Sequence, residues 1–119
     1  MTGKVEADPG PLRLERVLHA LGDAVRLGIV RQLARDGESS CAALNGNRSK
    51  STMSHHFRVL REAGLVRTRN QGVTHMNALC TETVEAAFPG LLGAVIAAPA
   101  DTTEAGGTQP GPAGRRALR

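Results

Sequence analysis

Apolar residues recur with a helical period through the first half of the chain, and this pattern predicts four helices. The first begins near Pro11. Its apolar stripe has the i, i+3, i+4, i+7 spacing of an amphipathic helix and consists of Leu14, Val17, Leu18 and Leu21. A second helix over about 24–35 begins after Asp23, a good N-cap residue. Its inner face is expected to hold Leu27, Val30 and Ala34, flanked by Ile29 and Leu33.

Turn-forming residues separate the next two helices. Gly37 ends the second helix, and either Ser39 or Ser40 caps a short third helix that runs through Leu44. The segment 45–48 has the composition of a turn. A fourth helix over about 50–63 follows, capped by a serine and stopped by a glycine. Its expected inner face consists of Met53, Phe57 and Leu60.

The period then changes to two. Residues 65–69 and 73–79 alternate around Asn70-Gln71-Gly72, which predicts a β-hairpin with a glycine-containing turn. An apolar helical segment over about 81–98 follows. Because Pro89 cannot lie inside a helix, we expect a break near residue 88, with Pro89 starting the main helical part. Four helices, a hairpin and a last helix predict a mainly α winged helix-turn-helix fold.

Composition limits what surrounds this unit. Residues 1–10 and 99–119 are rich in Pro, Gly and polar residues and are expected to be disordered tails on a folded domain of residues 11–98. The chain has no Trp or Tyr and two Phe, which argues against modules that stack bases on aromatic rings. Two cysteines are too few for a disulfide scaffold. With no membrane-length apolar run and no signal peptide, we expect a cytoplasmic protein with no membrane partner.

Positive charge is concentrated in one segment. Residues 48–69 hold six cations and one acid, which gives +5 in a chain whose net charge is +4. The six cations are Arg48, Lys50, Arg58, Arg61, Arg67 and Arg69. The fourth helix also begins with small polar residues on its outer side, as suits a helix that enters the major groove of double-stranded DNA. A solvated helix with ordinary capping serines is the simpler reading, but charge, layout and a basic hairpin together favour DNA binding.

The residues also resemble a known family. The stretch LGDAVRLGIVRQLARDGESSCAAL and, after it, SKSTMSHHFRVLREAGLVRTRNQGV are similar to the ArsR/SmtB family of bacterial transcriptional regulators, over roughly residues 12–98. The most specific piece is STMSHHFRVLREAGLV, which corresponds to the recognition helix and the start of the wing.

The resemblance implies a repressor that binds an inverted-repeat operator and is released by an inducer. It places Ser51, Thr52, Ser54, His55 and His56 on the DNA-reading helix, and Arg67, Arg69 and Gln71 on the wing. It also implies a homodimer through the first and last helices. A dimer is favoured independently by the thin core and by an apolar last helix that needs a partner surface. The expected interface residues are Leu14, Leu18, Leu91, Leu92 and Val95.

Many relatives sense metals, but the usual sites are incomplete here. The two thiolate positions of the third helix fall on Ser40 and Ala42, with Cys41 between them. One thiolate is a poor trap for arsenite, lead or cadmium. The last helix, the other familiar site, has no His. The remaining candidates, which could bind nickel or zinc only weakly as a cofactor, are His19, Cys41, His75 and Cys80. Both cysteines are read as small core residues, with a thiol redox switch as the alternative.

The sequence contains no motif for catalysis: no phosphate loop, paired carboxylates or nucleophile with a base. We therefore expect no enzyme. The alternative to a DNA-reading repressor is a winged-helix protein-interaction module or activator that needs a second regulatory protein. A shift assay with purified protein alone separates the two hypotheses.

Overall fold

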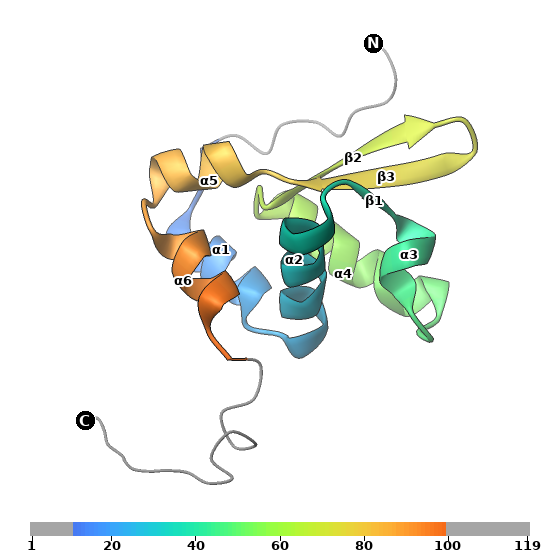
Figure 1. The fold of residues 1–119 in the computed structure, drawn as a ribbon, viewed down its shortest axis with the longest axis horizontal. Helices are drawn as coiled ribbons and strands as arrows, with labels where there is room; N and C mark the ends of the chain where they lie inside the picture. The colour runs from blue at the N-terminus through green and yellow to red at the C-terminus, as the bar shows by residue number, and fades with distance from the viewer. Residues whose placement is uncertain (1–10, 100–119) are drawn as a thin grey trace, which may run out of the picture.

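The computed structural model describes residues 11–99, so the predicted tails lie outside the described residues apart from Pro99. The elements in chain order are α1 (Leu14–Leu21), α2 (Ala24–Asp36), β1 (Ser39–Ser40), α3 (Cys41–Asn45), α4 (Lys50–Glu62), β2 (Val66–Gln71), β3 (Thr74–Leu79), α5 (Thr81–Ala87) and α6 (Leu91–Ala97) (Figure 1). The predicted winged helix-turn-helix is confirmed. Figure 1 shows α3 and the tip of the β2–β3 wing on one side of the molecule and α5 and α6 on the other.

The predicted caps of the second and third helices are confirmed, whereas the first helix begins at Leu14 rather than near Pro11. The Asp23 carboxylate accepts hydrogen bonds from the backbone N–H groups of Val25 (2.9 Å) and Arg26 (3.1 Å). Of the two serines predicted to cap the third helix, it is Ser40 that accepts from the helix backbone. Each cap satisfies a donor that the first turn of a helix leaves without a partner.

The inner face of α2 differs from the expected one. The buried residues are Arg26, Ile29, Val30 and Leu33, whereas Ala34 is exposed. These four follow the i, i+3, i+4, i+7 spacing with an arginine in the first position. The expected face, centred on Leu27, Val30 and Ala34, is therefore rotated by about one residue from the observed one. It included only apolar residues, whereas the observed face includes an arginine.

The turn of the wing lies later in the chain than predicted, and the sheet has a third strand at the base of the wing. Asn70 and Gln71, expected in the turn, belong to β2, and Gln71 pairs with Thr74. The turn is therefore Gly72-Val73, and Gly72 has φ +65°, a conformation that favours glycine. Strand β1, which the alternation was too short to indicate, pairs antiparallel with β3 and gives the sheet order β1-β3-β2.

The last helical segment is two short helices. The break falls near residue 88 as predicted, but Pro89 does not start the second helix, because Gly90 precedes α6 as its N-cap with φ +86°. The Glu85 carboxylate of α5 reaches across the break. It accepts hydrogen bonds from the backbone N–H groups of Gly90 (2.8 Å) and Leu92 (2.9 Å), which fixes the start of α6.

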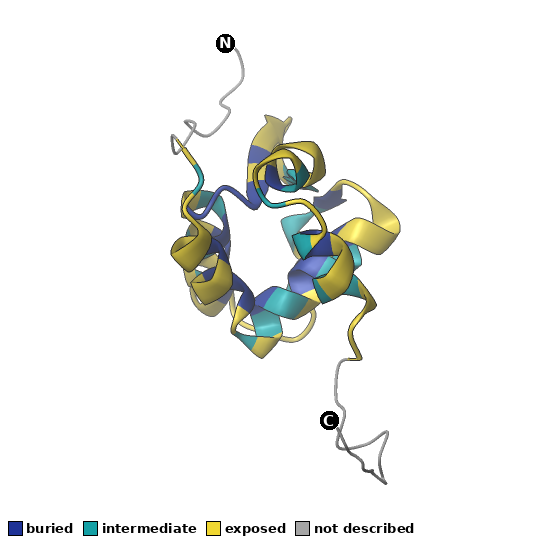
Figure 2. Ribbon diagram, turned by 90° about the vertical axis from the view of Figure 1, so that its left-hand side faces the viewer, coloured by how far each residue is buried: buried dark blue, intermediate teal, exposed yellow. Residues whose placement is uncertain are grey.

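One apolar core joins all six helices. It draws Val17, Ala20 and Leu21 from α1, the inner faces of α2 and α4, Leu44 from α3, Val84 from α5 and Leu92 from α6. Figure 2 shows buried residues along the inner sides of the helices and exposed residues outside. The expected inner residues of α4, Met53, Phe57 and Leu60, are confirmed as buried. This packing leaves the opposite face of α4 free for other contacts.

Candidate nucleic-acid interface

Helix α4 is held by well-defined ends. At its start the Ser49 hydroxyl accepts a hydrogen bond from Thr52 N–H at 3.2 Å. At its end Leu65 N–H donates to the Leu60 carbonyl (3.0 Å) and Gly64 N–H to the Arg61 carbonyl (3.0 Å). With Gly64 at φ +86°, this is a Schellman motif, and it turns the chain directly into the wing.

The outward face of α4 presents the polar residues predicted to contact DNA. The exposed members of this set are Lys50, Ser51, Thr52, Ser54, His55 and Arg58 of α4, together with Arg48 in the turn before it. The Ser49 hydroxyl donates to Thr52 Oγ1 at 2.9 Å. Thr52 accepts that bond and keeps its own hydroxyl hydrogen for an outside acceptor, so it is oriented and still able to donate. Small donors and cations on one helix face are suited to base edges and phosphates.

The wing adds a second polar face. Arg67, Arg69 and Gln71 alternate along β2 and are exposed, whereas Val66 and Thr68 point into the molecule. The Arg69 guanidinium donates to both carboxylate oxygens of Glu38, at 2.7 and 2.8 Å, and to Gln71 Oε1 at 2.9 Å. This hydrogen bonding from Arg69 lowers the pKa of the Glu38 carboxyl group. Arg67 is exposed on this face, while the Arg69 guanidinium is held by an acid.

A buried polar contact ties the two strands of the wing to its base. Thr68 Oγ1 donates to Asn77 Oδ1 at 2.7 Å, and the Asn77 amide nitrogen donates to the Ser39 carbonyl and to Cys41 Sγ, both at 3.3 Å. Asn77 is completely buried. A buried amide with its partners satisfied fixes the register of the wing against β1 and α3.

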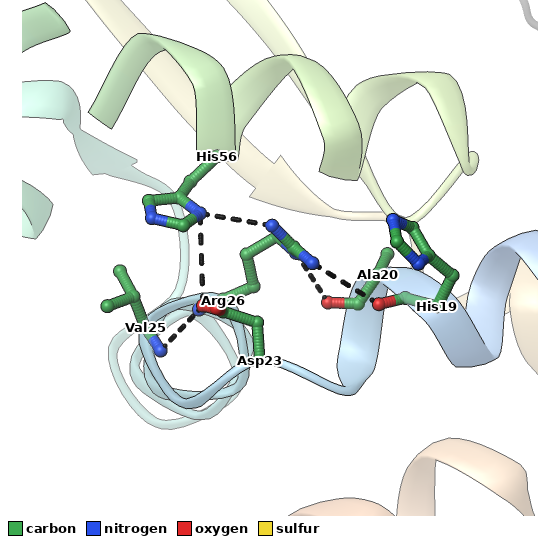
Figure 3. A network of polar contacts seen from close by, with 6 residues as sticks. All are labelled: His19, Ala20, Asp23, Val25, Arg26 and His56. Carbon is green, nitrogen blue, oxygen red and sulfur yellow. Dashed lines mark hydrogen bonds and ion pairs between the residues drawn. The ribbon is translucent and has the colours of Figure 1, made fainter. Parts of the chain in front are cut away.

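His56 does not share the outward face, which corrects its predicted place among the DNA contacts. Its side chain is 12% exposed and points toward α2, where Nδ1 lies 3.1 Å from the Arg26 Nη1 and 3.8 Å from the Asp23 carboxylate (Figure 3). The reason is helical phase, because His56 lies three residues after Met53 and four before Leu60, on the inner side of α4. His55 is exposed and keeps its predicted position.

Arg26 is the centre of this polar network. It is 7% exposed, and its Nε donates to the Ala20 carbonyl at 2.8 Å while Nη2 donates to the His19 carbonyl at 3.3 Å (Figure 3). Both carbonyls belong to the last turn of α1. The pKa of His56 is lowered, mainly because burial disfavours its charged form, and the pKa of Asp23 is lowered first by its bond from the Arg26 backbone.

The weak metal candidates are not assembled into a site. Within residues 11–99 no group of three or more His, Cys, Asp and Glu side chains could hold a metal ion. Cys41 and Cys80 are half-buried and pack against the core, in line with their reading as small core residues. His19 and His75 are exposed. None of the described helices is long and apolar enough to cross a membrane.

The residues predicted for a dimer interface fall into two groups. Leu14 and Leu18 of α1 are 44% and 50% exposed, unusual for large apolar side chains. Leu91 and Val95 are half-buried at the core margin. Leu92 is 1% exposed, which corrects its assignment: it belongs to the core, because α6 turns it toward α2 and α5.

Three residues that matter here were not singled out from the sequence. Arg26 stands at an inward position of an otherwise apolar helical stripe, which is the signal that could have found it, whereas Asn77 lies in a strand that also holds Thr74 and His75 and gave no such signal. Glu38 gave no such signal, since its partner Arg69 lies 31 residues away.

Comparison with known proteins agrees with this architecture. A helix-turn-helix domain model matches residues 21–69. The chain is 40% identical over 80 residues, 65% of this chain and 80% of the relative, to the uncharacterized HTH-type transcriptional regulator YceK of Bacillus subtilis. An uncharacterized HTH-type transcriptional regulator of Methanocaldococcus jannaschii is 34% identical over 58 residues, 47% of this chain and 65% of that relative.

Two solved structures have a similar fold over a larger share of the chain than the domain model matches. The match to a structure of an ArsR family transcriptional regulator has a TM-score of 0.58 at 24% sequence identity. It covers 68% of this chain and 90% of the chain in that structure. The match to a second structure, of a possible transcriptional regulator for arsenical resistance, has a TM-score of 0.55 at 26% sequence identity. It covers 87% of this chain and 100% of the chain in that structure. The chain belongs to the ArsR-like winged helix-turn-helix transcriptional regulators. The predicted family is thereby confirmed.

Proposed function

We propose that this ArsR-like regulator is a homodimer that represses transcription in the cytoplasm by binding an inverted-repeat operator. Each subunit inserts α4 into the major groove and lays β2 along the neighbouring backbone. The observation that supports this most is the division of α4, which buries Met53, Phe57 and Leu60 and exposes Thr52, His55 and Arg58. No catalytic step is part of the proposal.

The exposed residues divide into two roles. Ser51, Thr52, Ser54 and His55 are proposed to contact base edges, because they lie on the N-terminal half of α4. Arg48, Lys50, Arg58, Arg67, Arg69 and Gln71 are proposed to contact phosphates and set the register on the duplex. A segment with net charge +5 also steers the protein toward DNA.

The dimer is supported by the exposed apolar face of α1. Leu14 and Leu18 are half-exposed one helical turn apart, and pairing them with their symmetry copies removes this surface from water. Leu91 and Val95 of α6 are proposed to extend the interface. Two subunits related by a two-fold axis would present two copies of α4 to two half-sites one helical turn apart.

The test is selection of bound duplexes from a random-sequence library by the purified protein alone. An enriched inverted repeat supports the proposal, and the affinity for that duplex should fall by about 10³–10⁵ between about 50 and 200 mM salt if six to ten phosphates are neutralised. A flat salt profile would contradict backbone binding. Enrichment of no sequence unless a second protein is added would support the partner-dependent alternative.

A further inference from the structure

We propose that Arg26 and His56 are positioning residues for DNA binding, which hold the recognition helix α4 on the corner between α1 and α2. This inference rests on the proposed DNA-binding function and adds the contact by which the fold orients the helix. Neither side chain touches DNA in this arrangement.

The geometry makes one guanidinium the link between three elements. Arg26 belongs to α2. Its guanidinium group has only donors, and it donates to the His19 and Ala20 carbonyls of α1 and to His56 of α4 (Figure 3). Because the side chain is 7% exposed, water cannot replace a lost partner fully. The orientation of α4 relative to α1, the proposed dimer helix, therefore depends on the Arg26–His56 contact.

The contact requires a neutral histidine. A guanidinium has only donors, so His56 Nδ1 must accept, and the ring hydrogen must lie on Nε2. Protonation places a hydrogen on Nδ1, where it faces the Arg26 donor. The Asp23 carboxylate, 3.8 Å from the same nitrogen, is then the available acceptor. A charged His56 therefore changes its hydrogen-bond partner from Arg26 to Asp23. The link from α4 through Arg26 to the α1 carbonyls is then lost.

The surrounding groups determine when this exchange occurs. Four charged or titratable groups act on His56: Asp23 and Arg26 from the α2 side, and His55 and Arg48 from α4 and the turn before it. Burial and the positive groups lower the pKa of His56, while Asp23 opposes them. Since the folded state favours the neutral ring, the contact is intact above the ordinary histidine value and is lost as pH falls through the lowered pKa.

The expected result is that DNA binding becomes weaker in acid. Added positive charge alone would make it stronger, so the two effects have opposite directions. By simple electrostatics, acid adds positive charge to a protein surface and should tighten phosphate binding. When the contact is lost, α4 adopts several orientations relative to α1. The apparent affinity for DNA then falls in proportion to the fraction of molecules whose α4 has the binding orientation. A loss of binding between about pH 7.5 and pH 5 therefore reports the positioning contact.

The experiment measures binding of a fluorescent duplex of about 30 base pairs, enriched by selection, at both pH values. His56→Ala should bind about tenfold more weakly than wild type at about pH 7.5, because it removes the acceptor. His56→Asn places an amide oxygen near the position of Nδ1 and does not titrate. It should restore much of the affinity lost in His56→Ala and show no loss in acid. His75→Asn, the matched control on the exposed wing, should keep the acid loss.

Amide hydrogen exchange of the free protein gives a second readout that needs no DNA. At about pH 5 the α4 amides of wild type should exchange faster than those of His56→Asn, with no difference in α5. Equal affinities of wild type and His56→Ala, or an acid loss that persists in His56→Asn, would overturn the inference. Failure of wild type to bind any duplex would contradict the proposed function instead, and the exchange rates would then decide the positioning role.

Discussion

Glu38 and Arg69 form a two-pronged ion pair at the base of the wing, with Nε–Oε2 at 2.7 Å and Nη2–Oε1 at 2.8 Å. The pair joins the loop before β1 to β2, the strand whose outer face is proposed to follow the DNA backbone. Both partners are partly exposed, at 34% and 45% of the side chain. A phosphate that reaches Arg69 must therefore compete with a carboxylate that is already bound.

Glu38→Gln should consequently strengthen DNA binding. An exposed pair is worth about 0.2–1 kcal/mol, so affinity for any duplex should rise by up to about fivefold, and the salt slope should steepen by about one. Fluorescence anisotropy over a salt series measures both. Glu82→Gln, which removes the same charge from α5, is the control and should leave the slope unchanged. Weaker binding by Glu38→Gln would mean that Glu38 orients Arg69 for DNA rather than competing for it.

Substitutions on α4 and on the wing should have different effects on specificity. Thr52→Ala should lower the preference for the selected duplex over a random one by about 1–3 kcal/mol if its hydroxyl donates to a base. Arg67→Ala should weaken both duplexes alike and reduce the salt slope by about one. Competition binding with the two duplexes measures the preference. Identical losses on both duplexes for both variants would exclude base reading by Thr52.

The dimer proposal is tested on α1. Leu18→Glu places a charge on a half-exposed apolar position, so it should separate the subunits with little effect on the fold of each. Sedimentation at a concentration where wild type is dimeric should show a monomer, and operator binding should weaken because the two half-sites act together only in a dimer. Val73→Glu, at the fully exposed wing tip, is the matched control and should leave the dimer intact. A dimeric Leu18→Glu would place the interface elsewhere.

Soft metals should not release the DNA. Cys41 lies beside the Asn77 amide, and residues 11–99 contain no group of three or more His, Cys, Asp and Glu side chains that could hold a metal ion. Calorimetric titration of arsenite, lead and cadmium, with and without the selected duplex, should show no stoichiometric tight binding. Nickel and zinc should bind weakly and with little coupling, because coupling requires different affinities for the free and DNA-bound forms. Nanomolar binding that dissociates the duplex would reveal ligands brought together across the dimer.

The sequence predicted those parts of the fold that local chemistry decides. Asp23, Ser40 and Ser49 cap the helices at the predicted positions, because a short polar side chain before an apolar period has one favourable use. The alternation after Gly64 predicted the wing, because a period of two is a local property of a half-buried strand. The turn was misplaced by two residues, since Asn, Gln and Gly are all acceptable in a turn and only strand pairing decides between them.

Contacts between distant residues could not be predicted in this way. Arg26 was not singled out from the sequence, and arginine is seldom buried, yet its acceptors in α1 and α4 satisfy it. His56 was assigned to the DNA face together with His55, although one residue of helical phase separates an exposed side chain from an inward one. Glu38 and β1 depend on partners in β2 and β3, which periodicity within one segment does not reveal.

Arg26 also offers a stability test that is independent of DNA. Lysine keeps the positive charge but has no planar fork, so Arg26→Lys cannot reach Ala20, His19 and His56 together. At least one buried acceptor then loses its donor, and the free energy of unfolding should fall by about 1–3 kcal/mol, measured by urea denaturation. Arg35→Lys, on the same helix but exposed and paired with its neighbour Asp36, should change the free energy of unfolding by less than about 0.5 kcal/mol. Equal stabilities of the two variants would show that the network holds the helices no better than a solvated charge, and the positioning of α4 would need another cause.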